Sequence, residues 1–196
     1  WFSASTLQLP RSSAKIWLVR CPELYERDGI YTQDGDEHVR FAMLDVGQGL
    51  AAVVETRHHV LVYDAGPSFR SGSDTGTLVV EPYLRHRGLR RIDVLVVSHD
   101  DLDHAGGVAS LARLMPVRRL VTNGHEPAAP GPIGHCRRGG RWRWDGVSFE
   151  WLHPGPELPP GDNDRSCVLR VQIGPHVLLL TGDVERLAET EMQAHG

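Results

Sequence analysis

The chain carries the run His99-Asp100-Asp101-Leu102-Asp103-His104 directly after the apolar stretch 92–98. Five of the six side chains in this run are ionisable, and three of them are aspartates. Carboxylates that crowd the end of a buried strand repel one another unless cations or water compensate their charge. The run therefore predicts a site for more than one metal ion.

The apolar patterns on both sides of the run predict short strands and interposed helices. Residues 92–98 are typical of a strand, and apolar residues recur at helical spacing over 105–115, so the run is expected on a strand-to-helix loop. Further helices are expected at 77–88 and after Asp183. The other expected strands are 41–46, 51–55, 60–63, 118–121, 147–152, 167–173 and 177–181. This order predicts an α/β sandwich with mixed sheets.

Composition indicates an ordinary globular domain. The 196 residues carry a formal net charge of −4, which offers no global electrostatic attraction for nucleic acid. Residues 1–38 show no sustained hydrophobic period, and we interpret them as a linker or an N-terminal edge segment. Cys21, Cys136 and Cys167 are odd in number and widely spaced, which indicates neither a thiolate zinc site nor a disulfide framework.

Spacing within the acidic run suggests how metal ions could be held. On an extended loop His99 and Asp101 point to the same side, while Asp103 and His104 can turn toward a second point. Two adjacent ligand pairs could therefore hold two cations. The alternative is a solvated acidic loop whose histidine caps the following helix. The buried strand before the run favours the metal site.

The stretch 99–107, which ends in Ala105-Gly106-Gly107, resembles the metal-binding signature HxHxDH of the metallo-β-lactamase superfamily, with aspartate at the second histidine. Three flanking motifs occur in the order expected for that superfamily: Leu44-Asp45-Val46-Gly47-Gln48-Gly49, Val62-Tyr63-Asp64-Ala65-Gly66 and Leu180-Thr181-Gly182-Asp183. Together they resemble the C-terminal domain of the ComEC/Rec2 family of DNA-uptake channel proteins of bacterial competence. The resemblance implies a metallo-β-lactamase-like αββα sandwich over residues 39–196, truncated at its C-terminal end.

The resemblance also implies roles for the residues of the run. His99 and Asp101 would hold one metal ion, and Asp103 and His104 the other. Asp183 would bridge both ions. Asp103, Asp101 and His99 are the residues expected to carry catalysis.

Two other aspartates accompany this site. Asp64 would support the loop through hydrogen bonds rather than bind metal. Where the superfamily usually supplies another histidine, this chain offers residues 162–166, in which Asp164 could approach the metal or belong to a polar turn. Aspartate at position 101 makes the site rich in oxygen, which favours Mn²⁺, with Mg²⁺ or Zn²⁺ as alternatives. Two such ions suit phosphodiester hydrolysis.

Two further segments are candidates for contacts with nucleic acid. Asp45, Gln48 and Gly49 could form a loop that offers backbone N–H groups to a phosphate, although a β-turn explains the glycine nearly as well. Residues 136–144 alternate arginine with tryptophan, a pattern that could track a DNA strand. We prefer a hairpin whose tryptophans pack on the core while the arginines face water. The candidate arginines are Arg137, Arg138, Arg141 and Arg143.

The family resemblance implies a metal-dependent nuclease domain that degrades the non-transported strand of incoming DNA during transformation. Its implied partners are DNA, a membrane channel portion of the same polypeptide and other DNA-uptake proteins. The implied location is a soluble domain of a bacterial inner-membrane protein, with the periplasmic or extracellular face favoured. Two alternatives stay open: a superfamily hydrolase of small esters, thioesters or lactams, and a degenerate domain that binds DNA or a protein partner without catalysis.

Overall fold

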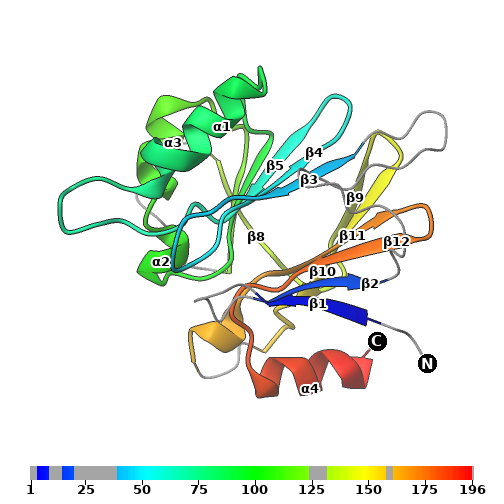
Figure 1. Cartoon of the computed structure of the whole chain (residues 1–196). Coiled ribbons are helices and arrows are strands. Elements are labelled where there is room, and N and C mark those ends of the chain that lie inside the picture. The colour runs from blue at the N-terminus through cyan, green and yellow to red at the C-terminus, as the bar shows by residue number, and fades with distance from the viewer. Residues whose placement is uncertain (1–3, 9–14, 20–38, 124–131, 158–160, 196) are drawn as a thin grey trace.

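The structure is a computed structural model that describes residues 4–8, 15–19, 39–123, 132–157 and 161–195. Two six-stranded sheets face each other, and helices cover their outer faces (Figure 1). The helices α1 (Glu81–His86) and α3 (Val108–Leu114) lie against one sheet, and α4 (Arg186–His195) lies outside the other. This αββα sandwich confirms the fold class expected from the sequence.

The first sheet is mixed, and its strand order places the acidic run. Its strands, in spatial order, are β3 (Arg40–Met43), β4 (Ala52–Glu55), β5 (Val60–Tyr63), β6 (Val94–Val97), β7 (Leu120–Thr122) and β8 (Ile133–His135). β3 to β5 pair antiparallel, whereas β5 to β8 pair parallel. Parallel neighbours need crossover connections, which α1 and α3 provide. The carboxyl ends of β5 and β6 therefore meet at one edge, where the run begins.

The second sheet is antiparallel throughout. Its strands, in spatial order, are β1 (Ala4–Gln8), β2 (Lys15–Val19), β12 (His176–Leu180), β11 (Val168–Ile173), β10 (Val147–His153) and β9 (Arg141–Trp144). β2 pairs with β12, so the segment 1–38 contributes two strands at one edge of this sheet. Asp145 and Gly146 connect β9 to β10 with φ angles of 48° and 88°, as in a two-residue hairpin turn.

The strand β6 is buried on both faces, which explains its continuous apolar sequence. Val94 and Val96 pack into the core between the two sheets. Leu95 and Val97 pack into a second core between the first sheet and its helices. The strand that leads to the acidic run is therefore held on both sides.

Three short helical segments are also present: η1 (Gly76–Val80), α2 (Leu102–Ala105) and η2 (Asn163–Arg165). The helix expected at 105–115 starts at Val108, because Gly106 and Gly107 separate α2 from α3. A Cβ atom on Gly107 would lie 2.4 Å from the carbonyl oxygen of Ala65, so glycine allows this close approach. The second half of the acidic run consequently lies in a helical turn rather than on an extended loop.

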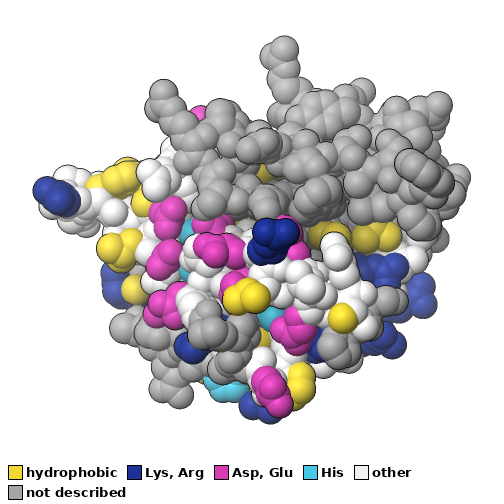
Figure 2. All heavy atoms as spheres, turned by 90° about the horizontal axis from the view of Figure 1, so that it is seen from below, with side chains coloured by type: hydrophobic (Ala, Val, Ile, Leu, Met, Phe, Trp, Pro, Cys, Tyr) yellow, Lys and Arg dark blue, Asp and Glu magenta, His cyan; other side chains and the backbone are white. Residues whose placement is uncertain are grey.

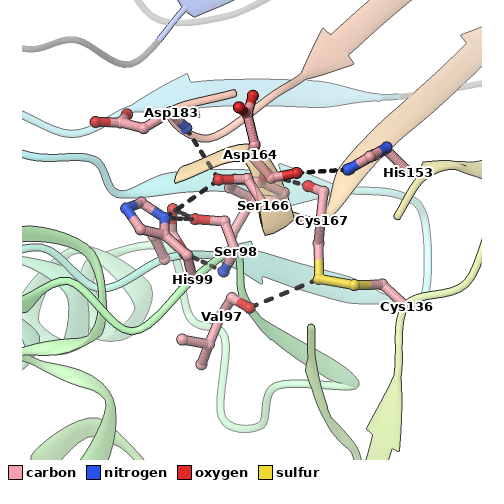
Figure 3. Close-up of a disulfide and its surroundings, with 11 residues drawn as sticks. Val97, Ser98, His99, Cys136, His153, Asp164, Ser166, Cys167 and Asp183 are labelled. Carbon is pink, nitrogen blue, oxygen red and sulfur yellow. Dashed lines mark hydrogen bonds between the residues drawn. A yellow bond between two sulfur atoms is a disulfide. The ribbon is translucent and has the colours of Figure 1, made fainter. Parts of the chain in front are cut away.

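A disulfide joins Cys136, which follows β8, to Cys167, which precedes β11 (Figure 3). Because β8 and β11 belong to different sheets, this bond links the two layers of the sandwich. The expectation that no disulfide is present is wrong. The spacing of the cysteines could not predict this disulfide, because the two residues are 31 positions apart and meet only when the sheets stack.

Replacing both Cys136 and Cys167 with serine is expected to lower the free energy of unfolding by about 3–4 kcal/mol, since a loop of this length loses its covalent closure in the unfolded chain. Urea denaturation of the oxidised protein and of the double variant measures the difference. Reduced wild-type protein should behave like the variant. Equal unfolding midpoints for the oxidised protein and the variant would contradict a stabilising role for the disulfide.

Asp145 joins the two sheets at the end of the sandwich away from Asp64. Its carboxylate accepts hydrogen bonds from Thr56 Oγ1 at 2.6 Å and from the His58 backbone amide at 2.9 Å. Nδ1 of His58 and Nδ1 of His59 lie 2.9 and 3.0 Å from the same carboxylate. Burial opposes ionisation, but the hydrogen bonds from Thr56, His59 and His58 outweigh it and hold the pKa of Asp145 well below its usual range.

A depressed carboxyl pKa makes stability depend on pH in a defined direction. The contribution of Asp145 is present above the unfolded-state pKa, near 3.9 for aspartate, and is lost as the pH falls toward the folded-state value. We therefore expect Asp145→Asn to be less stable than wild type at pH 7, and the gap to shrink below about pH 4. Thermal denaturation over a pH series tests this, with the exposed Asp162→Asn as control. A gap independent of pH would refute it.

Candidate metal centre

Two neighbouring parallel strands deliver the first polar residues of the centre. Asp64 follows β5, and Ser98 and His99 follow β6; all three residues are fully buried. The Ser98 backbone amide donates to Asp64 Oδ1 at 2.7 Å, and the Ser98 hydroxyl donates to Asp64 Oδ2 at 2.7 Å. The pairing of β5 with β6 thus places a buried carboxylate beside the first histidine of the run.

One carboxylate orients both imidazoles of the run. His104 lies on α2, and its Nδ1 is 2.7 Å from Asp64 Oδ2. His99 Nδ1 is 2.9 Å from the Ser98 hydroxyl, which itself donates to Asp64 (Figure 3). When both Nδ1 atoms donate these hydrogen bonds, each Nε2 keeps a free lone pair. Both rings are therefore prepared to accept a cation at Nε2.

The third member of the centre, Asp183, follows β12 in the second sheet and is 7 % exposed. Its Oδ1 lies 3.3 Å from His104 Nε2. The ring centroids of His99 and His104 are 4.3 Å apart. One ligand atom from each of the three residues falls within 4.8 Å of the other two. Residues from both sheets therefore converge on one point.

The donor set fits a divalent cation. Nε2 of His99 and Nε2 of His104 are buried and make no hydrogen bond within the part of the chain that the structure describes. A buried polar atom without a partner costs about 1–3 kcal/mol. Two imidazole nitrogens and one carboxylate oxygen are common ligands of divalent transition metals. His99, His104 and Asp183 are the residues that would hold the ion.

The same neighbours set the protonation of His104 in the absence of metal. Burial opposes a charged imidazole, but the carboxylates of Asp64 and Asp183 outweigh burial and raise the pKa of His104 to about 10. Metal-free His104 is therefore protonated at neutral pH. A cation at Nε2 must displace that proton, since only neutral imidazole is a ligand.

We expect Mn²⁺ binding near pH 7.5 to release about one proton, and the affinity to rise with pH up to the pKa of His104, about 10. Titration calorimetry in two buffers of different ionisation enthalpy counts the released protons. The variant His86→Ala, which removes an exposed histidine from α1, should release the same number. Metal binding without proton release would contradict the assigned state of His104.

The two aspartates predicted as paired ligands lie at the margin of this centre. Asp101 Oδ2 is 3.4 Å from His99 Nε2, and the Asp101 side chain is 53 % exposed. Asp103 is half-buried on α2, and its backbone carbonyl accepts the Leu50 amide at 3.2 Å. Asp101 therefore lies beside His99 as its spacing suggested, and both aspartates lie outside the group formed by His99, His104 and Asp183.

The candidate phosphate loop lies directly against α2. A Cβ atom on Gly49 would sit 1.9 Å from the Asp103 carbonyl oxygen, and the φ of Gly49 is +105°, so this position requires glycine. Asp45 Oδ1 accepts the Gly47 amide at 3.1 Å, and both Asp45 and Gln48 are exposed. Asp45, Gln48 and Gly49 therefore lie beside the acidic run.

Asp164 lies outside the group formed by His99, His104 and Asp183. Its Oδ1 accepts the backbone amides of Glu185 at 2.9 Å and Ala188 at 3.2 Å, at the start of α4. Its carbonyl oxygen lies 2.7 Å from His153 Nε2 (Figure 3). The carboxylate therefore serves the amino end of a helix, and Asp164 lies outside the His99, His104 and Asp183 group.

Sequence reasoning missed two serines that contact His99. Ser98 could have been found, because it immediately precedes His99 at the end of a strand. Ser166 Oγ lies 3.4 Å from His99 Nδ1 and accepts the Asp183 amide at 3.3 Å (Figure 3). No local signal marks Ser166, since it reaches the site only through the stacking of the two sheets.

The four candidate DNA-contact arginines occupy different environments. Arg138 pairs with Glu191. Arg141 Nε donates to Glu150 at 2.9 Å, and Arg143 Nε donates to the Gly146 carbonyl at 3.1 Å. Arg137 is exposed and makes no ion pair with the described residues. Of the four arginines, Arg137 is therefore the one whose surroundings leave it available to bind an anion.

The tryptophans between these arginines behave as the preferred hairpin interpretation predicts. Trp142 and Trp144 are partly buried and pack against the core between the sheets, whereas Arg141 and Arg143 are exposed. The alternation of arginine and tryptophan thus matches a strand that has one face on the core and the other exposed to solvent.

An αββα sandwich whose two sheets bring two histidines and an aspartate together is an arrangement typical of metal-dependent hydrolases. A model of the metallo-β-lactamase superfamily matches residues 44–195, and the chain belongs to this superfamily. The same residue range contains all four motifs that carried the family resemblance.

Curated relatives narrow the family further. "Recombination protein 2" of Haemophilus influenzae is 38 % identical over 142 residues, which are 72 % of this chain and 18 % of that protein. "Competence protein ComA" of Neisseria gonorrhoeae is 38 % identical over 148 residues, which are 76 % of this chain and 20 % of that protein. The expected ComEC/Rec2 relationship is thereby confirmed. The chain spans about a fifth of the length of these relatives.

Among solved structures, the metallo-β-lactamase SMB-1 matches with a TM-score of 0.47 and 15 % identity, over 84 % of this chain and 70 % of that one. A metallo-β-lactamase of Cronobacter sakazakii matches with a TM-score of 0.44 and 18 % identity, over 64 % and 54 % of the two chains. Within the described residues, no helix combines the length and the apolar character that crossing a membrane requires.

Proposed function

We propose that this domain is a metal-dependent nuclease that degrades one strand of DNA during uptake by a competent bacterium. The observation that carries the proposal is the buried group of His99, His104 and Asp183. Two relatives named for competence and recombination support DNA as the substrate. DNA, a channel portion of the same polypeptide and other DNA-uptake proteins are the partners that this role requires.

The proposed cofactor is a pair of divalent ions, with Mn²⁺ as the first choice over Mg²⁺ and Zn²⁺. His99, His104 and Asp183 would hold one ion, and Asp101, which lies beside His99, would supply oxygen ligands for a second together with Asp103 of the same run. Oxygen-rich sites favour harder ions such as Mn²⁺. Bound ions of this kind would polarise a phosphodiester and stabilise the charge that develops during its hydrolysis.

The residues around the ions would position the substrate and keep the ligands in place. Asp64 holds His104 directly and His99 through Ser98, which limits the motion of both rings. The loop that contains Gly49 lies against α2 and leaves Gln48 exposed next to the run. This loop is suited to hold the phosphate beside the cleaved bond, with its backbone amides as donors.

We further propose that the domain works on the periplasmic or extracellular side of the inner membrane. The support is the disulfide between Cys136 and Cys167, whose sulfurs link the two sheets. Disulfides form and persist in oxidising compartments and are rare in the cytosol. Because both cysteines are buried in the disulfide, the test labels a cysteine introduced at an exposed position, His86→Cys, on whole cells with a reagent that does not cross the inner membrane. Labelling that requires permeabilised cells would contradict it.

Nuclease activity is tested by incubating the protein with end-labelled linear DNA and Mn²⁺, with a chelator in a parallel reaction. We expect cleavage by wild type and by His86→Ala, and at least a 100-fold lower rate for His104→Ala and Asp103→Ala. Equal cleavage by these variants would place the activity elsewhere. A thioester and a β-lactam are tested as alternative substrates, and hydrolysis of either one without DNA cleavage would favour a small-molecule hydrolase. The metal content of the purified protein is measured as well. A folded protein that binds no metal would favour a degenerate domain.

A further inference from the structure

A cavity of about 450 Å³ opens between the two sheets, where β8 ends one sheet and β9 ends the other. Arg118 and Arg119 enter it from the amino end of β7, and Arg137 and Arg141 from the segment around β9. The metal-centre residues follow the carboxyl ends of β5 and β6 instead. Since β6 and β7 run parallel, the arginines of β7 and the metal centre lie at opposite ends of the sheet.

The positive charge of this cavity is only partly neutralised by its surroundings. The lining contains four arginines and a single carboxylate, Asp93. Asp93 is shared, because it lies 3.1 Å from Arg91 and 3.3 Å from Arg118. Arg119 and Arg137 are exposed and make no ion pair within the described ranges of the chain. The cavity therefore favours an anion.

The surface also carries local basic groups. In the face shown in Figure 2, several Lys and Arg side chains lie together at the right edge, while others lie among the acidic side chains. A net charge of −4 therefore does not exclude local basic surfaces.

Tryptophans form the other part of the lining, and the protein holds them rigidly. Trp144 is stacked on His59 with ring centroids 4.8 Å apart, and Trp142 is stacked on Phe149 at 4.9 Å. Nε1 of Trp142 is buried and has no acceptor among the described residues. Fixed indoles provide contact area for a flat ring at a low entropy cost, and Nε1 provides a donor for an oxygen of the ligand.

We propose that this cavity binds nucleotides of single-stranded DNA, with phosphates on Arg119 and Arg137 and a base against the tryptophans. Arginine forks match phosphate oxygens, and indoles stack on unpaired bases of any sequence. The site deepens the proposed nuclease function and rests on it, because it would hold the strand with residues outside the metal-centre group. Of the arginines in this segment, Arg137 would contact the DNA strand. Arg138 and Arg143 already interact with Glu191 and with the Gly146 carbonyl.

The test measures the anisotropy of a fluorescently labelled 12-nucleotide thymidine strand, titrated with protein in the presence of a chelator so that cleavage does not interfere. The test variant is Arg119→Ala with Arg137→Ala. The matched control is Arg113→Ala with Arg143→Ala, which removes two exposed arginines outside the cavity. We expect at least tenfold weaker binding for the test variant alone, and a salt dependence of log K reduced by about 0.7 for each lost phosphate contact.

A second readout is tryptophan fluorescence, which the strand should quench in wild type and quench less in Trp142→Phe. Thermal denaturation verifies that the variants stay folded. Equal binding by the test and control variants would overturn the proposal, as would a blunt duplex that competes as well as the single strand. Because binding is measured without metal, strand binding by a protein that never cleaves DNA would support this site while removing the nuclease proposal.

Discussion

Replacing His104 with alanine is expected to lower the Mn²⁺ affinity of the domain at least 100-fold, which exceeds the usual effect of removing an outer hydrogen-bond partner. The imidazole contributes Nε2 to the group that it forms with His99 and Asp183. Its loss leaves one imidazole and one carboxylate, too few to hold an ion tightly. Titration calorimetry with Mn²⁺ measures the change, with the exposed His86→Ala as a matched control.

The same substitution is expected to destabilise the metal-free protein. Asp64 and His104 are both fully buried, and Nδ1 of His104 lies 2.7 Å from the Asp64 carboxylate. Removal of one member of a buried ion pair leaves an uncompensated charge, at a cost of about 3–5 kcal/mol. Denaturation in chelator measures this cost. Unchanged metal affinity together with unchanged stability would contradict the assigned role of His104.

Replacing Asp64 with asparagine is expected to weaken Mn²⁺ binding by about 10- to 100-fold while every proposed ligand stays in place. The Asp64 carboxylate accepts two hydrogen bonds from Ser98 and lies 2.7 Å from His104 Nδ1. Asparagine has only one side-chain oxygen and presents an NH₂ group to one of these donors. The imidazoles would lose their common anchor and a partner that increases their basicity.

This variant also separates positioning from simple structural damage. The Asp64 carboxylate is the largest influence that raises the pKa of His104, so fewer protons should be released when Asp64→Asn binds metal. Asp162→Asn, at an exposed position, should change neither the affinity nor the proton count. Wild-type metal affinity in Asp64→Asn would show that the carboxylate does not orient the ligands.

Local sequence predicted the fold, and it identified the three residues that the structure brings together, because both depend on short patterns. The apolar character of 92–98 indicated a buried strand, and β6 within it is buried on both faces. The order of the four motifs predicted which strand ends carry Asp64, His99 and Asp183. Asp64 follows β5 directly, and His99 and Asp183 lie within three residues of the ends of β6 and β12.

The contacts of His104 were harder to predict, because they depend on where a helix begins. His99 and Asp101 lie 3.4 Å apart, as their spacing suggested. His104 lies on α2, which begins at Leu102, and its Nε2 is 3.3 Å from Asp183 Oδ1 in the other sheet. Contacts between the two sheets could not be predicted from local sequence patterns. Cys136 with Cys167, and Ser166 with His99, meet across sequence gaps that only the stacking of the sandwich closes.

The arginine and tryptophan segment shows the same limit. Its alternation predicted a strand with one face on the core, and β9 has this character. The second wall of the cavity comes from Arg118 and Arg119 near β7, which share no motif with the segment. Their contribution became visible only once the edges of the two sheets were placed together.

Crystals of the protein soaked in Mn²⁺ test the central claim most directly, because anomalous scattering locates the ion itself. The account predicts a strong anomalous peak within about 2.5 Å of Nε2 of His99, Nε2 of His104 and Oδ1 of Asp183. The peak should be absent from His104→Ala crystals treated in the same way. An ordered site without a peak, or a peak bound only by exposed carboxylates elsewhere on the surface, would contradict the account.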